Sequence, residues 1–231
     1  AITGAGYHSD FIQFHGHQGV GDYSDIIIRN NLGLNNQGQQ IILQSGIKNY
    51  AVINNILDTI GQDSAAAVIF SKKPWAQNNV IENTLMEFNT IVDGGSQLSF
   101  RNQNDIEWIN VVARNNLISP SKGLDYGGEP TREGTLVDYN LYDIWETRPL
   151  NPNSLDINTN NNHPNVGDRA TFFSDVFYQF VEYYGNDSQG DFHLASNSPA
   201  IGFANTESGI NYDIDFLPRD SQPDAGAREY R

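Results

Sequence analysis

Apolar and polar residues alternate in four short segments within the first half of the chain, and this pattern predicts β-strands. The segments begin at residues 11, 40, 67 and 97. Alternate side chains of a strand point to opposite faces, so the two apolar residues in each segment are expected to point inward. These inward pairs are Ile12 and Phe14, Ile41 and Leu43, Val68 and Phe70, and Leu98 and Phe100.

A second pattern follows each of these strands: an apolar residue, any residue, Asn, then Asn or Thr, then an aliphatic residue. It occurs five times, with small variations, in the segments 28–32, 52–56, 81–85, 113–117 and 137–141. Counted at its third position, the repeat runs from 30 to 54, 83, 115 and 139, which gives steps of 24, 29, 32 and 24 residues. Each repeat therefore holds at least two short strands and shows no helical period.

Repeats of this length made of short strands predict a right-handed parallel β-helix of about five coils over residues 1–145. Stacked coils would superpose Asn30, Asn54, Asn83 and Asn115 as an inward Asn ladder at a bend, because Asn tolerates left-handed backbone and its amide can reach the next coil. Tyr139 is expected to end this ladder in an atypical last coil. An immunoglobulin-like sandwich would place its turns closer together, and a leucine-rich repeat would need regularly spaced leucines.

After Trp145 the repeat stops, and residues 146–231 are expected to form a loop and a capping segment of the same domain. Residues 149–167 are rich in Asn and Pro, which is typical of a loop. Residues 171–184 are apolar enough to cover the open end of the stack, where unpaired backbone groups would invite aggregation.

The net charge and composition of the chain limit the classes of partner that it can be expected to bind. The chain has 13 basic and 28 acidic side chains, a formal charge of −15, and no Cys. Such acidity disfavours nucleic acid, and no apolar run reaches the roughly 20 residues that a membrane span needs. The chain begins at Ala1 and its only methionine is Met86, so we expect a processed extracellular or cell-surface protein, with an N-terminal segment or another subunit as a partner.

The C-terminal residues carry a resemblance to a known group. Ser198-Pro199-Ala200-Ile201, followed by Asp213, Arg219 and Asp224-Ala225-Gly226-Ala227, resemble the closing segment of secreted bacterial right-handed β-helix proteins of the pectate-lyase-like superfamily. The resemblance covers about 40 residues. It implies the fold, a polysaccharide as partner, and a role for these residues in fixing the cap to the last coils.

Two further resemblances concern activity. The opening His8-Ser9-Asp10-Phe11-Ile12-Gln13 is similar to a coil segment of β-helix proteins that act on glycans. Lys72 and Arg101 have the order and spacing of an essential Lys and Arg in the chondroitinase B and alginate lyase family. Ala65 to Ala67 stand where that family has calcium-binding acids, and Asn102 replaces its usual His.

Stacking the first strand set would align His15, Gln44, Ser71 and Arg101 in one outward column, with Gln13, Ile42, Ile69 and Ser99 beside it. Lys72 and Lys73 follow at a strand end. Elimination from a uronate needs carboxylate neutralisation, a base and an acid. We assign these roles to Arg101, to Lys72, and to His15 or Tyr126. Asp10, Gln13, Gln44 and Lys73 are the expected substrate-binding residues.

Several alternatives stay open. Asp10 with Asp22 or Asp25 could act as the paired carboxylates of a glycoside hydrolase, although Asp25 also fits a turn. Three histidines, His8, His15 and His17, could bind a metal ion. Surface carboxylates could hold calcium, but no acidic loop marks such a site. The non-enzyme alternative is a surface, fibre or adhesion module in which the column is an ordinary solvated face.

Overall fold

The structure is a computed structural model that describes residues 12–14, 23–33, 40–44, 46–58, 68–71, 80–94, 98–100, 106–121, 133–144, 152–156 and 192–231. Within these ranges every regular element is a β-strand. The all-β prediction is therefore confirmed for this part of the chain. The same ranges contain no helix long and apolar enough to cross a membrane.

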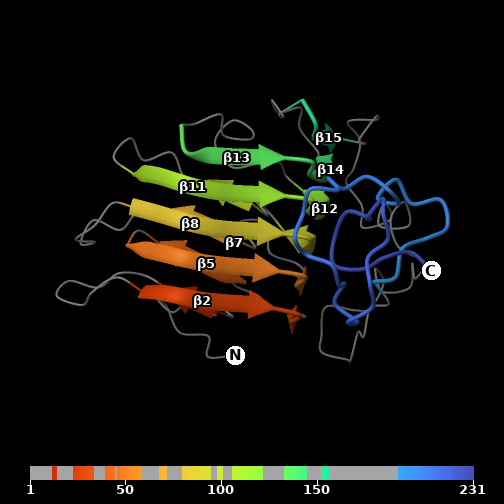
Figure 1. Ribbon diagram of the computed structural model, residues 1–231, viewed down its shortest axis with the longest axis horizontal. Helices are drawn as coiled ribbons and strands as arrows, with labels where there is room; N and C mark the ends of the chain where they lie inside the picture. The colour runs from red at the N-terminus through yellow and green to blue at the C-terminus, as the bar shows by residue number, and fades with distance from the viewer. Residues whose placement is uncertain are drawn as a thin grey trace.

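The strands form three parallel sheets (Figure 1). Sheet A has the order β1 (Ile12–Phe14), β4 (Ile41–Gln44), β7 (Val68–Ser71) and β10 (Leu98–Phe100). Sheet B has the order β2 (Tyr23–Arg29), β5 (Ile47–Ile53), β8 (Val80–Glu87), β11 (Glu107–Arg114) and β13 (Thr135–Asp138). Sheet C has the order β3 (Leu32–Gly33), β6 (Ile56–Asp58), β9 (Thr90–Gly94), β12 (Leu117–Ser121), β14 (Leu141–Ile144) and β15 (Leu155–Asp156).

From β1 to β12 the chain visits the three sheets in a fixed order, from sheet A to sheet B to sheet C and back to sheet A. All pairings between these named strands are parallel, and neighbours in a sheet come from successive repeats. An immunoglobulin-like sandwich is built from antiparallel strands, so this alternative is wrong. Strand β15 adds two paired residues beyond Trp145, where the sequence pattern predicts a loop.

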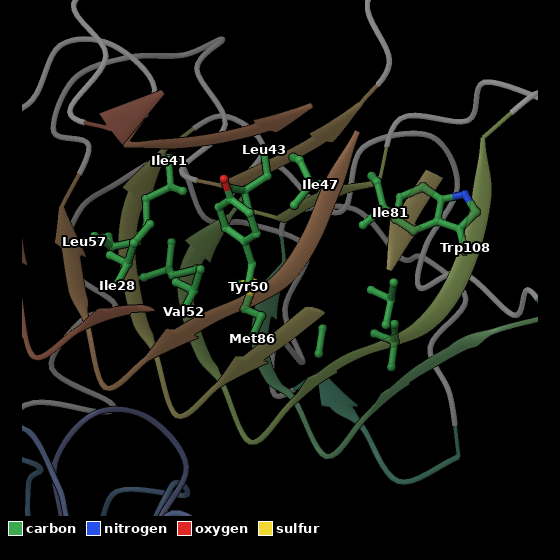
Figure 2. Close-up of a cluster of buried hydrophobic side chains, with 14 of the residues drawn as sticks. Ile28, Ile41, Leu43, Ile47, Tyr50, Val52, Leu57, Ile81, Met86 and Trp108 are labelled. Carbon is green, nitrogen blue, oxygen red and sulfur yellow. The ribbon is translucent and has the colours of Figure 1, made fainter. Parts of the chain in front are cut away.

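The inner faces of the sheets supply one apolar core (Figure 2). Ile41 and Leu43 of sheet A, Ile47 and Val52 of sheet B, and Leu57 of sheet C are all fully buried. Tyr50 lies among them, and its ring contacts Phe14 edge-on, with 5.5 Å between ring centroids. Burial of this apolar area is the main force that holds the three sheets together.

Sheet B passes into sheet C at a sharp corner, where each repeat has one residue with left-handed backbone. These corner residues are Asn30, Asn54, Phe88, Asn115 and Tyr139, with φ between 51° and 59°. Counted here, the steps are 24, 34, 27 and 24 residues, so the third repeat is aligned through Phe88. The predicted alignment through Asn83 is wrong. A bulky side chain rarely adopts this backbone, and at Phe88 the guanidinium of Arg219 packs 3.8 Å from the ring centroid.

The inward Asn ladder lies one residue later than predicted. Its members are Asn31, Asn55, Asn89, Asn116 and Asn140, and each Nδ2 donates to the Oδ1 of the next at 2.9–3.0 Å. The last four of these residues are fully buried. Because the ladder continues through Asn140, Tyr139 does not end it. We refer to these five residues as the inner ladder.

Residues 192–231 pack along this corner, at the carboxyl ends of the sheet B strands (Figure 1). Asn30 donates to the carbonyl of Ile214, and Asn54 donates to that of Tyr212. Apolar residues of the segment cover the outer side of sheet C and bury Ile56, Leu117 and Leu141. The expected contact with the last repeats is present at Leu117 and Leu141, and the segment also contacts the first three repeats at Asn30, Asn54 and Phe88.

Candidate functional site

The predicted columns on sheet A are confirmed where the structure describes them. Gln13, Ile42, Ile69 and Ser99 share one register position, and Gln44 is level with Ser71. The strand set that sequence alternation identified is therefore in register across four repeats. A residue that directly follows β7 and one that directly follows β10 come from neighbouring strands of one sheet.

Most predicted site residues lie outside the described residues. This applies to the proposed catalytic residues and to most of the expected substrate-binding residues: His15, Lys72, Arg101, Asp10 and Lys73. The possible acid Tyr126 and the histidines His8 and His17 also lie there. Gln13 is exposed on β1, and Gln44 ends β4. The structure therefore describes the strands that precede the predicted site residues, and it describes two of those residues, Gln13 and Gln44.

One residue of the predicted outward face is not open to solvent. Ile42 is only 4% exposed, although Ile41 and Leu43 beside it point into the core. Since side chains alternate along a strand, Ile42 points away from that core. The outer face of sheet A is thus closed to solvent at Ile42 of β4.

The carboxylate alternative can be examined at Asp25. Its φ is 61°, which confirms a turn-like position within β2. Its carboxylate accepts hydrogen bonds from Ser24 Oγ at 2.6 Å and Asn49 Nδ2 at 2.9 Å, and these lower the pKa of Asp25. A carboxyl group with a lowered pKa is ionised at neutral pH, so it is unsuited to act as a general acid. Asp10 and Asp22 lie outside the described residues.

In the described part of the chain, no three His, Cys, Asp or Glu side chains are placed so that they could hold a metal ion together. The three-histidine hypothesis concerns residues outside it. Among the described residues, a buried cluster of charged side chains is formed by Asp213, Arg219, Asp224 and Glu229 in the C-terminal segment, where the three acidic residues are at most 4% exposed.

Arg219 is the centre of that cluster. It donates to Glu229 at 2.5 Å, to Asn54 Oδ1 at 3.0 Å and to the carbonyl of Gly226 at 3.0 Å. Burial lowers the pKa of Arg219, while the charge of Glu229 opposes the shift. Burial also raises the pKa values of Asp224 and Glu229. Because these groups are sealed from solvent and paired with one another, we assign them the structural role of holding the segment at the corner.

Gly226 explains part of the C-terminal sequence pattern. Its φ is 95°, and a Cβ added there would lie 2.6 Å from Thr90 Oγ1 and 2.9 Å from Leu117 Cβ. Its N–H donates to the carbonyl of Asn115 at 2.9 Å. Only glycine allows this close approach of the segment to sheet C.

A second row of side chains, which sequence reasoning missed, crosses the outer face of sheet B. Asp25, Asn49, Asn83 and Asn110 share one register position, and we call them the amide row. Each Asn donates from Nδ2 to the oxygen of the preceding member at 2.9–3.0 Å. All four have left-handed backbone and are exposed.

The amide row continues in register to Gly134 of the fifth repeat, which has a φ of 80° and no side chain. A signal for it exists in the sequence. The five positions 25, 49, 83, 110 and 134 each lie five residues before a corner residue, at 30, 54, 88, 115 and 139. The misaligned third repeat hid this periodicity, because Asn83 was assigned to the corner itself.

Comparison with protein-family models gave no match for this sequence. Comparison with curated proteins gave none either. Function must therefore be argued from the residues themselves.

Proposed function

We propose that this chain is a right-handed parallel β-helix that binds a polysaccharide outside the cell or on its surface. The fixed order in which strands β1 to β12 visit the three parallel sheets supports the helical path. In that architecture residues 1–145 would be coils, and residues 146–231 the loop and capping segment of the same domain. The C-terminal resemblance to secreted β-helix proteins supports the location and the partner.

The activity that we propose is elimination from an acidic polysaccharide, as in a polysaccharide lyase. One observation carries this proposal. Phe70 of β7 and Phe100 of β10 are paired, so the residues following these strands, including Lys72 and Arg101, start from neighbouring strands. Arg101 would neutralise the uronate carboxylate, and Lys72 would act as the base that removes the C5 proton. His15, which follows Phe14 of β1, or Tyr126 would protonate the leaving oxygen.

The second candidate is a non-catalytic surface, fibre or adhesion module. The burial of Ile42 favours it, because a covered outer face at β4 interrupts a continuous groove over sheet A. A fold of this kind does not by itself imply catalysis. The two candidates differ in one measurable way, which is whether the polymer is cleaved or only bound.

The test is ultraviolet absorbance of the unsaturated uronate product, measured with alginate, pectate and chondroitin sulfate, with calcium present or chelated. The lyase proposal expects a rise that Lys72→Ala and Arg101→Ala each abolish. Lys48→Ala is the matched control, since Lys48 lies on sheet B and pairs with Glu82 at 3.2 Å. No rise with any of the three polymers would favour the binding module. Equal activity in the Lys72→Ala enzyme would refute the assigned base.

A further inference from the structure

We propose that the outer face of sheet B binds an extended, uncharged polysaccharide that runs across the strands along the amide row. This site lies on a different sheet from β1, β7 and β10, the strands that directly precede the proposed lyase residues. It does not depend on their activity. The argument uses the hydrogen bonds that the amide row leaves unused, the side chains beside it, and its charge.

The amide row uses only half of its hydrogen-bonding capacity. Asn83 Nδ2 donates once, to Asn49, and its Oδ1 accepts once, from Asn110, both at 3.0 Å. A carboxamide has two N–H groups and can accept two hydrogen bonds. One N–H and one acceptor position of Asn83 are thus left for solvent or a ligand.

The inner ladder shows what a purely structural Asn row looks like in this protein. Asn89 Nδ2 donates to Val52 O and to Asn116 Oδ1, and its Oδ1 accepts from both N and Nδ2 of Asn55. Its capacity is filled and it is fully buried. The amide row differs in both respects, because it is exposed and each of its asparagines keeps at least one donor and one acceptor.

An apolar column runs beside the amide row, two residues further along each strand. Its register-matched members are Ile27, Ala51, Leu85, Val112 and Leu136. Ile27 is 65% exposed and Leu136 is 45% exposed. Sugar rings present hydroxyl groups at their edge and C–H groups on their faces. The amide row can bind the hydroxyl edge while the apolar column contacts the C–H face.

The spacing suits a polymer rather than a single sugar. Adjacent strands lie about 4.8 Å apart, so equivalent groups recur at that interval across the sheet. This interval is comparable with the length of one sugar residue in an extended chain. Each successive residue could meet the same donor and acceptor pair.

Charge favours an uncharged polymer. Lys48 is paired with Glu82, and Arg114 with Glu87 at 2.9 Å, so these cations are already neutralised. Asp25 adds a negative charge at one end of the amide row, and the chain as a whole carries −15. A uronate polymer would be repelled here. It would need the separate cations of the proposed lyase site.

The left-handed backbone of the amide row allows a clean test. Glycine adopts this backbone without strain, and Gly134 already occupies the equivalent position in the fifth repeat. The triple variant Asn49→Gly, Asn83→Gly and Asn110→Gly therefore removes the amides but keeps the conformation that the sheet needs.

The experiment measures retention of the purified chain on insoluble β-1,4-glucan, β-1,4-mannan and chitin, with soluble oligosaccharides of the same linkage as competitors. We expect retention on at least one polymer and at least about tenfold weaker binding by the triple variant, since three steps of hydrogen bonding are lost. Circular dichroism and the urea midpoint verify that the variant is folded. Lys72→Ala with Arg101→Ala, which tests the lyase site, should bind like the wild type.

Two results would overturn the proposal. One is no retention on any of the three polymers, and the other is wild-type retention by the folded triple variant. A third result would assign the face differently: if Leu85→Ser converts a dimer into a monomer without any glycan binding, the apolar column is an interface between two copies. Loss of lyase activity with intact glycan retention would leave this proposal standing.

Discussion

The inner ladder can be tested at its middle member, Asn89. Replacing Asn89 with Ala removes four side-chain hydrogen bonds of 2.9–3.0 Å and a longer one, of 3.3 Å, to Glu87 O. Two come from Asn55, one goes to Val52 O and one to Asn116 Oδ1. All of these groups are buried. Their partners would be left unsatisfied where water does not reach them, which is the costly case for a lost hydrogen bond.

At about 1 kcal/mol for each of the four bonds, Asn89→Ala should lower the free energy of unfolding by about 4 kcal/mol. The matched control is Asn83→Gly in the amide row, which removes two hydrogen bonds that are exposed. Its backbone is left-handed, so glycine introduces no strain. We expect the control to lie within about 1 kcal/mol of the wild type.

The assay is urea unfolding followed by far-ultraviolet circular dichroism. An equal slope for both variants would show that the same surface is exposed on unfolding and that the midpoint shift measures stability. The reasoning fails if Asn83→Gly costs as much as Asn89→Ala. It also fails if Asn89→Ala lies within the error of the wild type, because the buried ladder would then contribute nothing that water cannot replace.

Three further predictions concern the core and the corner. Arg219→Met should cost about 3–5 kcal/mol, because it leaves buried Glu229 unpaired, whereas Arg231→Met, at a 45% exposed side chain, should cost less than about 1 kcal/mol in the same urea assay. Tyr50→Phe should raise the free energy of unfolding by on the order of 1 kcal/mol, because the buried hydroxyl of Tyr50 has no hydrogen-bond partner in the described structure. The thermal midpoint should rise accordingly, and a lower midpoint would contradict this. Gly134→Ala should be strongly destabilising because its Cβ would lie 1.8 Å from the carbonyl oxygen of Trp108, while Gly209→Ala, with nothing within 4 Å, should be neutral.

The strands of sheet A could be predicted from the sequence because their alternation is regular. Ile12, Ile41, Val68 and Leu98 share a register position, as their place in the pattern indicates. Parallel stacking also followed from the sequence, since a repeat of two or more short strands without a helix leaves few other arrangements. Side-chain period and repeat length are local properties, and both are visible in one sequence.

The alignment of the third repeat could not be predicted in the same way. Asn83 and Thr84 imitate the corner pattern five residues early, and Phe88 occupies the true corner. Phe is unfavourable with left-handed backbone, so a local rule selects Asn83. The structure uses Phe88 because Arg219, 131 positions further along the chain (219 − 88 = 131), stacks on its ring. A contact between residues so far apart in the sequence cannot be recognised from the local sequence pattern.

The aliphatic position that ends the corner pattern shows the same limit. Ile56, Leu117 and Leu141 point to the outer side of sheet C, where an isolated sheet would place polar residues. They are apolar because Phe192, Leu194 and other residues of the C-terminal segment cover them. The sequence shows that these positions are aliphatic, but only the packing explains which surface they bury. Because the C-terminal segment packs at the corner, Asn30 and Asn54 donate to its backbone carbonyls and not to each other.

The two asparagine rows bear on the choice between an enzyme and a binding module. Both rows are built on the same repeat, six residues apart, and both pair successive strands through their amides. Only the inner ladder is buried with its hydrogen-bonding capacity filled, so stability alone accounts for the recurrence of Asn in it from repeat to repeat. At the amide row the stability of sheet B requires left-handed backbone, and Gly134 meets this requirement without a side chain. The row also presents exposed carboxamide groups at regular intervals, which this requirement does not explain, at Asn49, Asn83 and Asn110. This surplus favours a surface that binds a repeating ligand, whether or not sheet A also cleaves one.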